Sequence, residues 1–216
     1  MKSILVELTL FFSALSGFTH SNATEITMSE GTFKSGYASV NGLKMYYEIH
    51  GVGGMPLVLI HGGGSTIETT FGHILPMLAN YRKVIALELQ AHGRTSDRNS
   101  PVSFEQDADD VAGLLHSLKI DKADFFGFSN GGNTAMQIGI RHPELVNKLI
   151  IASSFYKREG IVPGFFAFME KASLDNMPAL LKTAYLQVAA DKDHLQVMHD
   201  KDKERMVRFI DWTDED

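Results

Sequence analysis

The stretch 125-FFGFSNGG-132 decides the fold of this chain, because a buried strand ends in it and a helix begins. Apolar residues lead up to Gly127, and a helical pattern starts at Asn130. A serine in the pattern G-x-S-x-G between a strand and a helix is the setting of a nucleophile elbow. Gly127 and Gly131 let the strand and the helix approach each other closely. The hydroxyl of Ser129 is therefore the candidate nucleophile.

A second glycine-rich turn, His61-Gly62-Gly63-Gly64-Ser65, follows an apolar run that ends at Ile60. Its backbone has no side chains to keep it away from a bound carbonyl oxygen. We expect the N–H groups of Gly63 and of Asn130, the residue after Ser129, to stabilise a tetrahedral oxyanion. A phosphate-binding loop is the alternative. It is disfavoured because no Lys-Ser/Thr pair follows the glycines and the spacing is not G-x-G-x-x-G.

Short apolar runs predict the strands of a sheet. Asn41-Gly42 accepts the positive φ angles of a type I′ turn, so residues 37–40 and 43–49 predict an opening β-hairpin. Strands buried on both faces lack polar-apolar alternation, as in a parallel sheet covered by helices. Four later runs have this composition: Pro56–Ile60, Lys83–Leu89, Ala123–Phe128 and Lys148–Ala152.

Helical periodicity fills the gaps between these runs. The expected helices cover residues 67–78, 103–118, 130–141 and, after residue 153, 176–190 and 193–209. Pro76 should kink or end the first of them, and His142-Pro143 should stop the third. Ser103 and Gln106 have the spacing of a capping box. The strand-helix alternation predicts the α/β class, with a mostly parallel sheet and flanking helices.

The composition excludes several classes of function. The 216 residues include 20 Lys+Arg and 26 Asp+Glu, a formal net charge of −6, and 44% are hydrophobic, as in an ordinary globular protein. No block of basic residues forms an electrostatic footprint for nucleic acid or for anionic lipid. The absence of cysteine excludes disulfide scaffolds, thiolate zinc sites and a cysteine nucleophile. We expect a small-molecule substrate, no cofactor and no metal.

The first residues have the features of a secretory signal peptide. Lys2 supplies a basic start, Ile4 to Phe18 is mostly apolar, and Ser21-Asn22-Ala23 has the small-x-small pattern that signal peptidase cleaves. We predict removal of residues 1–23, with cleavage after Ala23, and a secreted or periplasmic protein without a membrane span. The alternative is an N-terminal amphipathic helix, which Glu7 within the apolar run favours.

These features together resemble the α/β-hydrolase fold family. The resemblance runs from about Gly36 to Asp216. It rests on the His61–Gly64 loop, the segment QAHGRT over 90–95, the turn at Ser129 and the helix ending RHPE over 141–144. It is strongest for the small single-domain esterase, lactonase and peroxidase-like branch, which has a helical cap after the sixth strand. A serine at the turn, rather than an aspartate, argues against the epoxide-hydrolase and dehalogenase branches.

The resemblance implies acyl transfer to water from an ester-like substrate. It makes Ser129 the nucleophile and Gly63 and Asn130 the oxyanion donors. It also implies that six residues support the loop and the turn: His61, Gly62, Gly64, Gly127, Phe128 and Gly131. The core is expected over residues 24–155, and a helical cap region over 156–216 that is truncated before the C-terminal part of the core.

The family completes its catalytic triad with an acid after the seventh strand and a histidine after the eighth. This chain stops at Trp212-Thr213-Asp214-Glu215-Asp216, with no G-D-x-D-like strand end and no late histidine. A serine without a base is a poor nucleophile, because its hydroxyl stays protonated at neutral pH. We therefore expect this chain alone to hydrolyse esters badly or not at all.

Histidines inside the chain are weak substitutes for the missing base. His61 and His92 lie in strand-end loops, where a histidine more often braces a turn than catalyses. His194 and His199 are expected on solvated surface rather than at a metal, and Glu159 has no histidine to orient. Structural roles are expected for His50, His73, His116 and His142.

The cap adds one further candidate feature. Four apolar residues in it line either an acyl pocket or the cap's own core: Phe165, Phe166, Phe168 and Met169.

Three functions remain open. The favoured one is the N-terminal part of a secreted serine hydrolase, with the acid and base beyond residue 216. The second is a non-catalytic binding protein or a decayed enzyme on the same scaffold. The third is another reaction at the same site, such as perhydrolysis or peptide-end cleavage. The substrate and the oligomeric state stay unknown at this point.

Overall fold

The computed structural model describes residues 33–213 and residue 215. They belong to one compact unit, which spans Gly31–Asp216. The signal peptide over residues 1–23 lies outside the described residues, so it stays a prediction together with the secreted or periplasmic location. The boundary between core and cap at residues 155 and 156 also stays a prediction.

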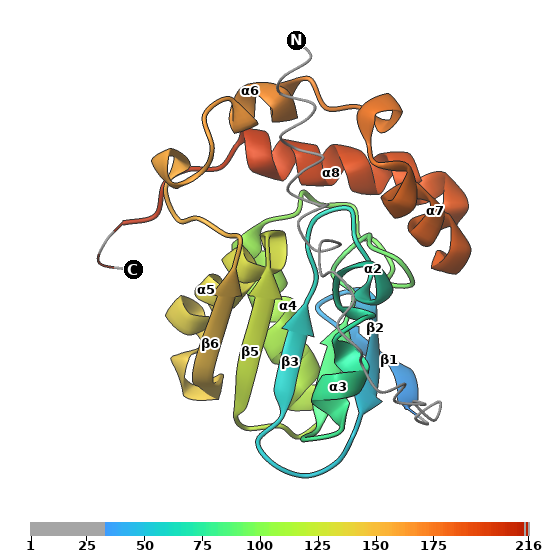
Figure 1. Cartoon of the computed structure of the whole chain (residues 1–216), viewed down its shortest axis with the longest axis vertical. Helices are drawn as coiled ribbons and strands as arrows, with labels where there is room; N and C mark the ends of the chain where they lie inside the picture. Colours follow the sequence, from blue (N-terminus) through green and yellow to red (C-terminus); the bar gives the residue numbers. More distant parts are fainter. Residues whose placement is uncertain (1–32, 214, 216) are drawn as a thin grey trace, which may run out of the picture. The chain divides into compact units, whose positions relative to one another are not determined.

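Within the described residues, six strands form one mixed sheet in the order β1-β2-β4-β3-β5-β6 (Figure 1). β1, β2 and β4 pair antiparallel, whereas β4, β3, β5 and β6 pair parallel. The α/β class, the opening hairpin and the mostly parallel sheet are confirmed. The strands are β1 Lys34–Val40, β2 Leu43–His50, β3 Leu57–Ile60, β4 Val84–Leu87, β5 Ala123–Phe128 and β6 Val146–Ala152.

The hairpin turns at the predicted dipeptide. Asn41 and Gly42 both take positive φ angles, 46° and 84°, as a type I′ turn requires. The turn places Val40 opposite Leu43, which starts a regular antiparallel register.

Helices connect the later strands and form the cap. The core helices are α2 Ile67–Phe71, α3 Leu75–Ala79, α4 Phe104–Ser117 and α5 Asn130–Arg141, and the cap helices are α6 Phe165–Glu170, α7 Ala179–Val188 and α8 Leu195–Val207. Short 3-10 turns lie at Pro143–Leu145, Arg158–Gly160, Leu174–Asn176 and Lys192–His194. The helices predicted over 103–118 and 130–141 are confirmed to within a residue at each end.

The first helical segment differs from the prediction. The pattern predicts one helix over residues 67–78 that Pro76 kinks or ends, but the chain forms two short helices, α2 and α3, with Gly72 at the end of α2. Pro76 lies in the first turn of α3, where a missing N–H removes no helical hydrogen bond. The proline therefore helps to begin the second helix rather than to end the first.

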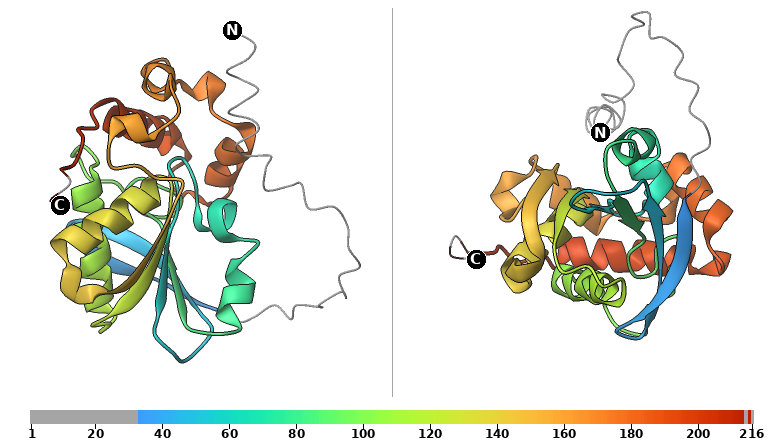
Figure 2. Two further views of the ribbon diagram at one scale, coloured as in Figure 1. Left: turned by 60° about the vertical axis from the view of Figure 1, so that its left-hand side comes forward. Right: turned by 90° about the horizontal axis from the view of Figure 1, so that it is seen from below.

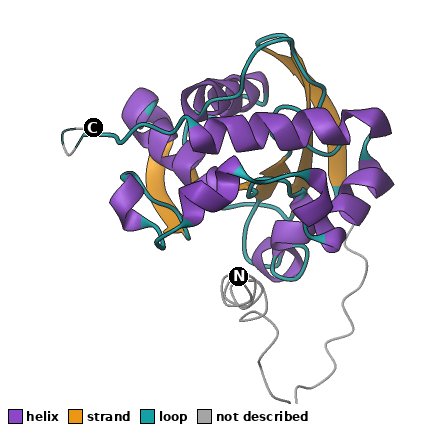
Figure 3. Ribbon diagram, turned by 90° about the horizontal axis from the view of Figure 1, so that it is seen from above, coloured by secondary structure: helices purple, strands orange, loops and turns teal. Residues whose placement is uncertain are grey.

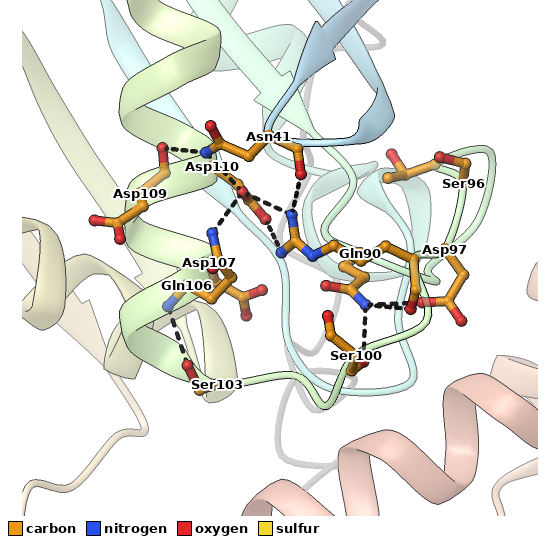
Figure 4. Close-up of polar contacts among 12 residues, drawn as sticks. Asn41, Gln90, Ser96, Asp97, Ser100, Ser103, Gln106, Asp107, Asp109 and Asp110 are labelled. Carbon is orange, nitrogen blue, oxygen red and sulfur yellow. Dashed lines mark hydrogen bonds and ion pairs between the residues drawn. The ribbon is translucent and has the colours of Figure 1, made fainter.

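The predicted cap of α4 is confirmed in part. The Ser103 side chain accepts a hydrogen bond from the N–H of Gln106 at 3.1 Å. The Gln106 side chain does not reach back to Ser103 but donates to Asp110 at 3.0 Å, as Figure 4 shows. Asp110 also accepts from Asn41 at 3.0 Å and pairs with Arg98. This buried carboxylate ties α4 to the hairpin turn and to the loop after β4.

The central strands are buried on both faces, as predicted. Successive side chains of a strand point to opposite faces. Val58 and Ile60 of β3 therefore join an apolar cluster with α4 and α5, whereas Leu57 and Leu59 join another with α2 and α3. Figure 2 shows these two pairs of helices on opposite sides of the sheet.

The last strand does not match the prediction. The apolar run over 148–152 predicts a strand buried on both faces, like β3, but Leu149, Ile150 and Ile151 of β6 are 38%, 47% and 37% exposed. β6 pairs with β5 on one side and is an edge strand within the described part of the chain. An edge strand lacks a neighbour to cover its side chains, which explains the exposure.

The segment after β6 forms the helical cap. As predicted, no strand follows Ala152 among the described residues. Figure 1 shows α6, α7 and α8 beyond the end of the sheet toward which β3, β5 and β6 point, and Figure 3 views the molecule from this side. In the described part of the chain, no helix combines the length and the apolar character needed to cross a membrane.

Candidate active site

The order of the strands brings the two glycine-rich turns together. β3 and β5 are parallel neighbours, and Ile60 at the end of β3 pairs with Gly127 of β5. The loops that leave their carboxyl ends therefore emerge side by side at the end of the sheet. The chain passes from β3 to β4 on one side and later to β5 on the other, which is the kind of switch point where α/β sheets bind ligands.

Ser129 occupies the strained turn that the motif predicts. Its backbone has φ 53° and ψ −120°, a region that residues with side chains rarely adopt, at a typical cost of about 1–3 kcal/mol. The strain is held by hydrogen bonds: Ser129 N donates to Ala152 O at 2.9 Å, and Ser154 Oγ donates to Ser129 O at 2.6 Å. The serine is half-buried and its side chain does not cap α5.

The glycines around Ser129 are required by close backbone contacts. A Cβ atom on Gly127 would lie 2.1 Å from the carbonyl oxygen of Gly131. A Cβ atom on Gly131 would lie 2.0 Å from the carbonyl oxygen of Ile60. Both distances are far below van der Waals contact, so only glycine allows β5, α5 and the end of β3 to meet.

The glycine loop lies directly against the serine turn. A Cβ atom on Gly62 would be 3.4 Å from the Cβ of Ser129 and 3.3 Å from the Phe128 ring. A Cβ atom on Gly63 would be 2.4 Å from the side-chain nitrogen of Asn130. Asn130 begins α5, where a backbone N–H has no preceding helical carbonyl to bind. The structure thus brings together Ser129, Gly63 and Asn130, as the sequence predicts.

His61 braces the loop with both ring nitrogens. Its Nε2 accepts from Leu89 N at 3.0 Å, so its Nδ1 carries the proton and donates to Gly62 O at 2.7 Å. The side chain is fully buried. Burial, and then the nearby His92, lower the pKa of His61 from 6.5 to about 3. This imidazole is neutral, and neither nitrogen is available to Ser129.

His92 is also fully engaged. Its Nδ1 donates to Gln90 O at 2.8 Å, and its Nε2 lies 2.9 Å from Asp202 Oδ2. Burial disfavours the charged ring, but the Asp202 carboxylate outweighs it and raises the pKa of His92 above the ordinary value. Because both of its ring nitrogens lie against other partners, His92 contacts the cap rather than serving as a base for the serine.

The Asp202 carboxylate joins the cap to the glycine loop. It is carried by α8, it is 7% exposed, and it accepts from Gly64 N at 2.7 Å and from Asn130 Nδ2 at 3.4 Å. Burial opposes its charge, but His92 and Arg205 hold the pKa of Asp202 well below its usual range. A carboxylate from the cap thus lies beside both residues that are expected to donate to the oxyanion.

Arg205 links this carboxylate to a second buried acid. It contacts Asp202 on its own helix and Asp107 on α4. Burial raises the pKa of Asp107 to about 6, although the Arg205 guanidinium acts in the opposite direction. The two carboxylates share one guanidinium, so the packing of α8 against the core depends on this arginine.

The loop that carries His92 is itself anchored to the cap. Gln90 Nε2 donates to Asp97 Oδ1 at 2.8 Å and to the Ser100 carbonyl oxygen at 3.4 Å, contacts that Figure 4 shows. The ammonium group of Lys201 on α8 lies 2.6 Å from the same Asp97 oxygen. Lys201 therefore docks α8 on this loop without contacting the glycine loop.

Four of the other histidines pair with acids away from the serine turn. The closest contacts are 2.8 Å for His50 with Glu48, His142 with Asp109 and His194 with Asp191, and 3.2 Å for His199 with Asp200. The side chain of His194 is 45% exposed, in line with the predicted solvated surface, whereas that of His199 is only 10% exposed, contrary to the prediction. Over residues 33–213 and 215, no group of three or more His, Asp or Glu side chains could hold a metal ion.

The aromatic residues of the cap pack among themselves. Phe165 and Phe166 each make an edge contact with Phe155, at 6.2 Å and 5.8 Å between ring centroids. With Met169 they pack against a buried cluster that includes Phe209, whereas Phe168 is not part of it. A cavity of about 340 Å³ opens beside this cluster near Trp212, and Ser129 is not in its lining. The described contacts favour the cap's own core over an acyl pocket.

The sequence interpretation missed Asp202, Arg205 and Asp107. Asp202 and Arg205 lie in a predicted helix whose many charged residues are typical of a solvated face. Their one local signal is the i, i+3 spacing of an acid and a base, which is common on exposed helices. Their burial depends on residues far away in the chain.

Comparison with known proteins concerns the family and the fold. Residues 55–201 match the family model described as alpha/beta hydrolase fold. The chain is 32% identical over 155 residues to a serine hydrolase of Homo sapiens, a match that covers 68% of this chain and 52% of that protein. It is 37% identical over 105 residues to the 2-hydroxymuconate semialdehyde hydrolase of Pseudomonas sp. (strain CF600), with 47% of this chain and 37% of that protein covered. The chain thus spans about half or less of these curated relatives.

Solved structures show the same fold. An epoxide hydrolase superimposes with a TM-score of 0.65 at 21% identity and covers 83% of this chain and 74% of its own. At that identity the likeness concerns the fold alone. A structure titled as an N-acyl homoserine lactone degrading enzyme superimposes with a TM-score of 0.59 at 28% identity, with 78% of this chain and 72% of that chain covered.

Proposed function

Because the chain belongs to the α/β-hydrolase fold family, we propose that it carries the nucleophile and the oxyanion hole of a serine hydrolase. The substrate we propose is a carboxylic ester or a similar acyl compound. The observation that carries this proposal is the strained backbone of Ser129, with φ 53°, at the start of α5 and against Gly62. Such strain persists where the surrounding structure over-determines it, and it concentrates at functional sites.

The proposed reaction proceeds through an acyl-enzyme. Ser129 Oγ attacks the substrate's carbonyl carbon, its proton passes to a general base, and the carbonyl electron pair moves onto oxygen. The N–H groups of Gly63 and Asn130 donate to that oxyanion, and losing one such donor typically lowers the rate by about 10²–10³-fold. The intermediate expels the alcohol, which takes up the proton. Water then attacks the acyl group in the same way and releases the acid and Ser129.

The general base is not among the histidines that brace the loops. His61 and His92 each use both ring nitrogens for other partners. Within the described residues, Ser129 Oγ forms no hydrogen bond. We therefore assign the base and its orienting acid to protein sequence beyond Asp216.

The relatives support an acyl substrate. The human relative is named a serine hydrolase, and one structural relative is titled as an enzyme that degrades N-acyl homoserine lactones. A non-catalytic binding protein on the same scaffold is the competing proposal. It is favoured by the unpartnered hydroxyl of Ser129.

The test uses the protein expressed from its complete reading frame, with p-nitrophenyl acetate and p-nitrophenyl butyrate as substrates. We expect Ser129→Ala to abolish both hydrolysis and labelling by a fluorophosphonate probe. Ser39→Ala, which alters an exposed serine of β1, is the matched control and should keep both. Hydrolysis that survives Ser129→Ala would overturn the assignment. Saturable ligand binding by a protein that neither hydrolyses esters nor takes up the probe would favour the binding protein.

A further inference from the structure

The oxyanion loop needs to be held by its surroundings. It contains three consecutive glycines, and glycine loses more conformational freedom on folding than any other residue. An oxyanion donor is effective only when its N–H group already points at the reacting oxygen. The partners of each peptide group in the loop therefore decide how well the site is formed.

The core fixes the first peptide group of the loop. Gly62 O accepts from His61 Nδ1 at 2.7 Å and from Ser65 N at 3.3 Å. A trans peptide is planar, so the N–H of Gly63 points away from that carbonyl. By binding the Gly62 carbonyl oxygen, His61 and Ser65 fix the direction of the Gly63 N–H on the opposite side of the same peptide group.

The cap fixes the next peptide group. Gly64 N donates to Asp202 Oδ2 at 2.7 Å, and its distance to His92 Nε2 is longer, at 3.2 Å. Gly63 thus lies between one peptide group held by the core and another held by α8. A Cβ atom on Gly63 would be 3.0 Å from Asp202 Oδ2, which shows how closely the carboxylate approaches the loop.

The same carboxylate reaches the second donor residue. Asp202 Oδ1 accepts from Asn130 Nδ2 at 3.4 Å, and Asn130 supplies the other proposed oxyanion N–H. A bare carboxylate here would repel a developing oxyanion. His92 and Arg205 lie against Asp202 and offset its charge, so its hydrogen bonds hold the loop without that repulsion.

We propose that Asp202 is a positioning residue of the oxyanion hole: through it the docked cap helix α8 fixes the Gly63–Gly64 peptide, and so keeps Gly63 from rotating its own N–H, the proposed donor, out of position. This inference rests on the proposed function. It means that the oxyanion hole is complete only when α8 is seated on the core. Asp202 itself does not touch the reacting atoms in this proposal.

The test compares three variants in the protein from the complete reading frame. Asp202→Ala removes the acceptor, Asp202→Asn keeps the size and one acceptor oxygen, and Lys201→Ala removes a neighbouring anchor of α8 that does not contact the loop. Circular dichroism confirms that each variant is folded. The readouts are kcat and KM for p-nitrophenyl butyrate, and amide hydrogen exchange of residues 61–65 by mass spectrometry.

We expect Asp202→Ala to lower kcat by about 10-fold to 100-fold, as small misplacements of catalytic groups do, while KM changes little. Asp202→Asn should fall between this variant and the unmodified protein. Exchange over residues 61–65 should become faster in Asp202→Ala. Lys201→Ala keeps the contacts of Asp202 with Gly64 and of Arg205 with Asp107, which still hold α8 on the core. It should therefore leave both kcat and the exchange of this segment near their original values.

Two results would overturn the inference. One is unchanged exchange over residues 61–65 in a folded Asp202→Ala protein. The other is an equal loss of kcat in Lys201→Ala, which would show that α8 needs only to be docked. If Ser129→Ala keeps full hydrolysis, the proposed function fails instead, and the exchange measurement alone then decides whether Asp202 holds the loop.

Discussion

The central sheet and the cap helix α8 are held in place by different interactions. The strands β3 and β4 bury only apolar side chains, on both faces. α8 adds charged contacts to its apolar ones, through Lys201, Asp202 and Arg205. Burial of an apolar side chain stabilises the folded state with little dependence on which apolar side chain it contacts. A buried charge is tolerated only beside a group of opposite charge or a hydrogen-bond partner. The sheet therefore follows from composition, and the position of α8 from a few specific pairs.

The largest effect should come from a glycine of α5 that lies against the end of β3. Gly131→Ala places a methyl group where the Ile60 carbonyl oxygen lies, at 2.0 Å. We expect a loss of more than about 4 kcal/mol of unfolding free energy, or no folded protein. Gly164→Ala at the start of the cap helix α6 is the control. It meets open space at φ +86° and should lose only about 1–2 kcal/mol, measured by urea denaturation.

If the two glycine variants were equally stable, close packing would not distinguish the core from the cap. A small loss in Gly131→Ala would also mean that α5 and the end of β3 can move apart. Either result would contradict the view that close packing holds the sheet and its helices together.

Next in size should be the arginine shared by two buried acids. Arg205→Gln leaves Asp107 and Asp202 without their common cation, and removing one partner of a buried pair typically costs about 3–5 kcal/mol. Arg208→Gln, on the same helix, removes an exposed pair with Glu204 and should cost at most about 0.5 kcal/mol. Thermal and urea denaturation of both variants measure the difference. Similar losses of unfolding free energy for the two arginine variants would contradict the view that specific buried charges hold α8 on the core.

The smallest expected effect is a difference in pH dependence between two histidines. The folded pKa of His61 is depressed to about 3, so its contribution is complete above 6.5 and is lost as the pH falls toward 3. The stability advantage of the unmodified protein over His61→Gln should therefore shrink by about 2 kcal/mol from about pH 7.5 to about pH 5. Urea denaturation at several pH values measures this change.

His92 is the control, because its contribution to stability should change with pH in the opposite direction. Its folded pKa is raised, so its contribution is present below 6.5 and is lost as the pH rises through the folded value. The advantage over His92→Gln should shrink at high pH instead. Parallel pH curves for the two variants would show that His61 and His92 are not held in different charge states.

Much of the core was predictable because its signals are local. The runs that end near Ile60 and Gly127 predict two buried strands, and the G-x-S-x-G pattern predicts the strained turn at Ser129. The exposure of Ile150 was not predictable, because an apolar run looks the same in a central strand and at an edge. The position of Pro76 in the first turn of α3 was not predictable either, because a proline marks a helix boundary without indicating on which side of it the helix lies.

The sequence by itself determined the α/β class, the two glycine-rich turns and the candidate nucleophile, since periodicity, turn residues and the need for glycine act over a few neighbouring positions. Only the tertiary structure decided that Asp202 meets Gly64, which is 138 positions away in the chain. It also decided which atoms the ring nitrogens of His61 and His92 contact. Partners of buried polar groups are chosen by the packing of whole elements, and such pairs leave no periodic trace in the sequence.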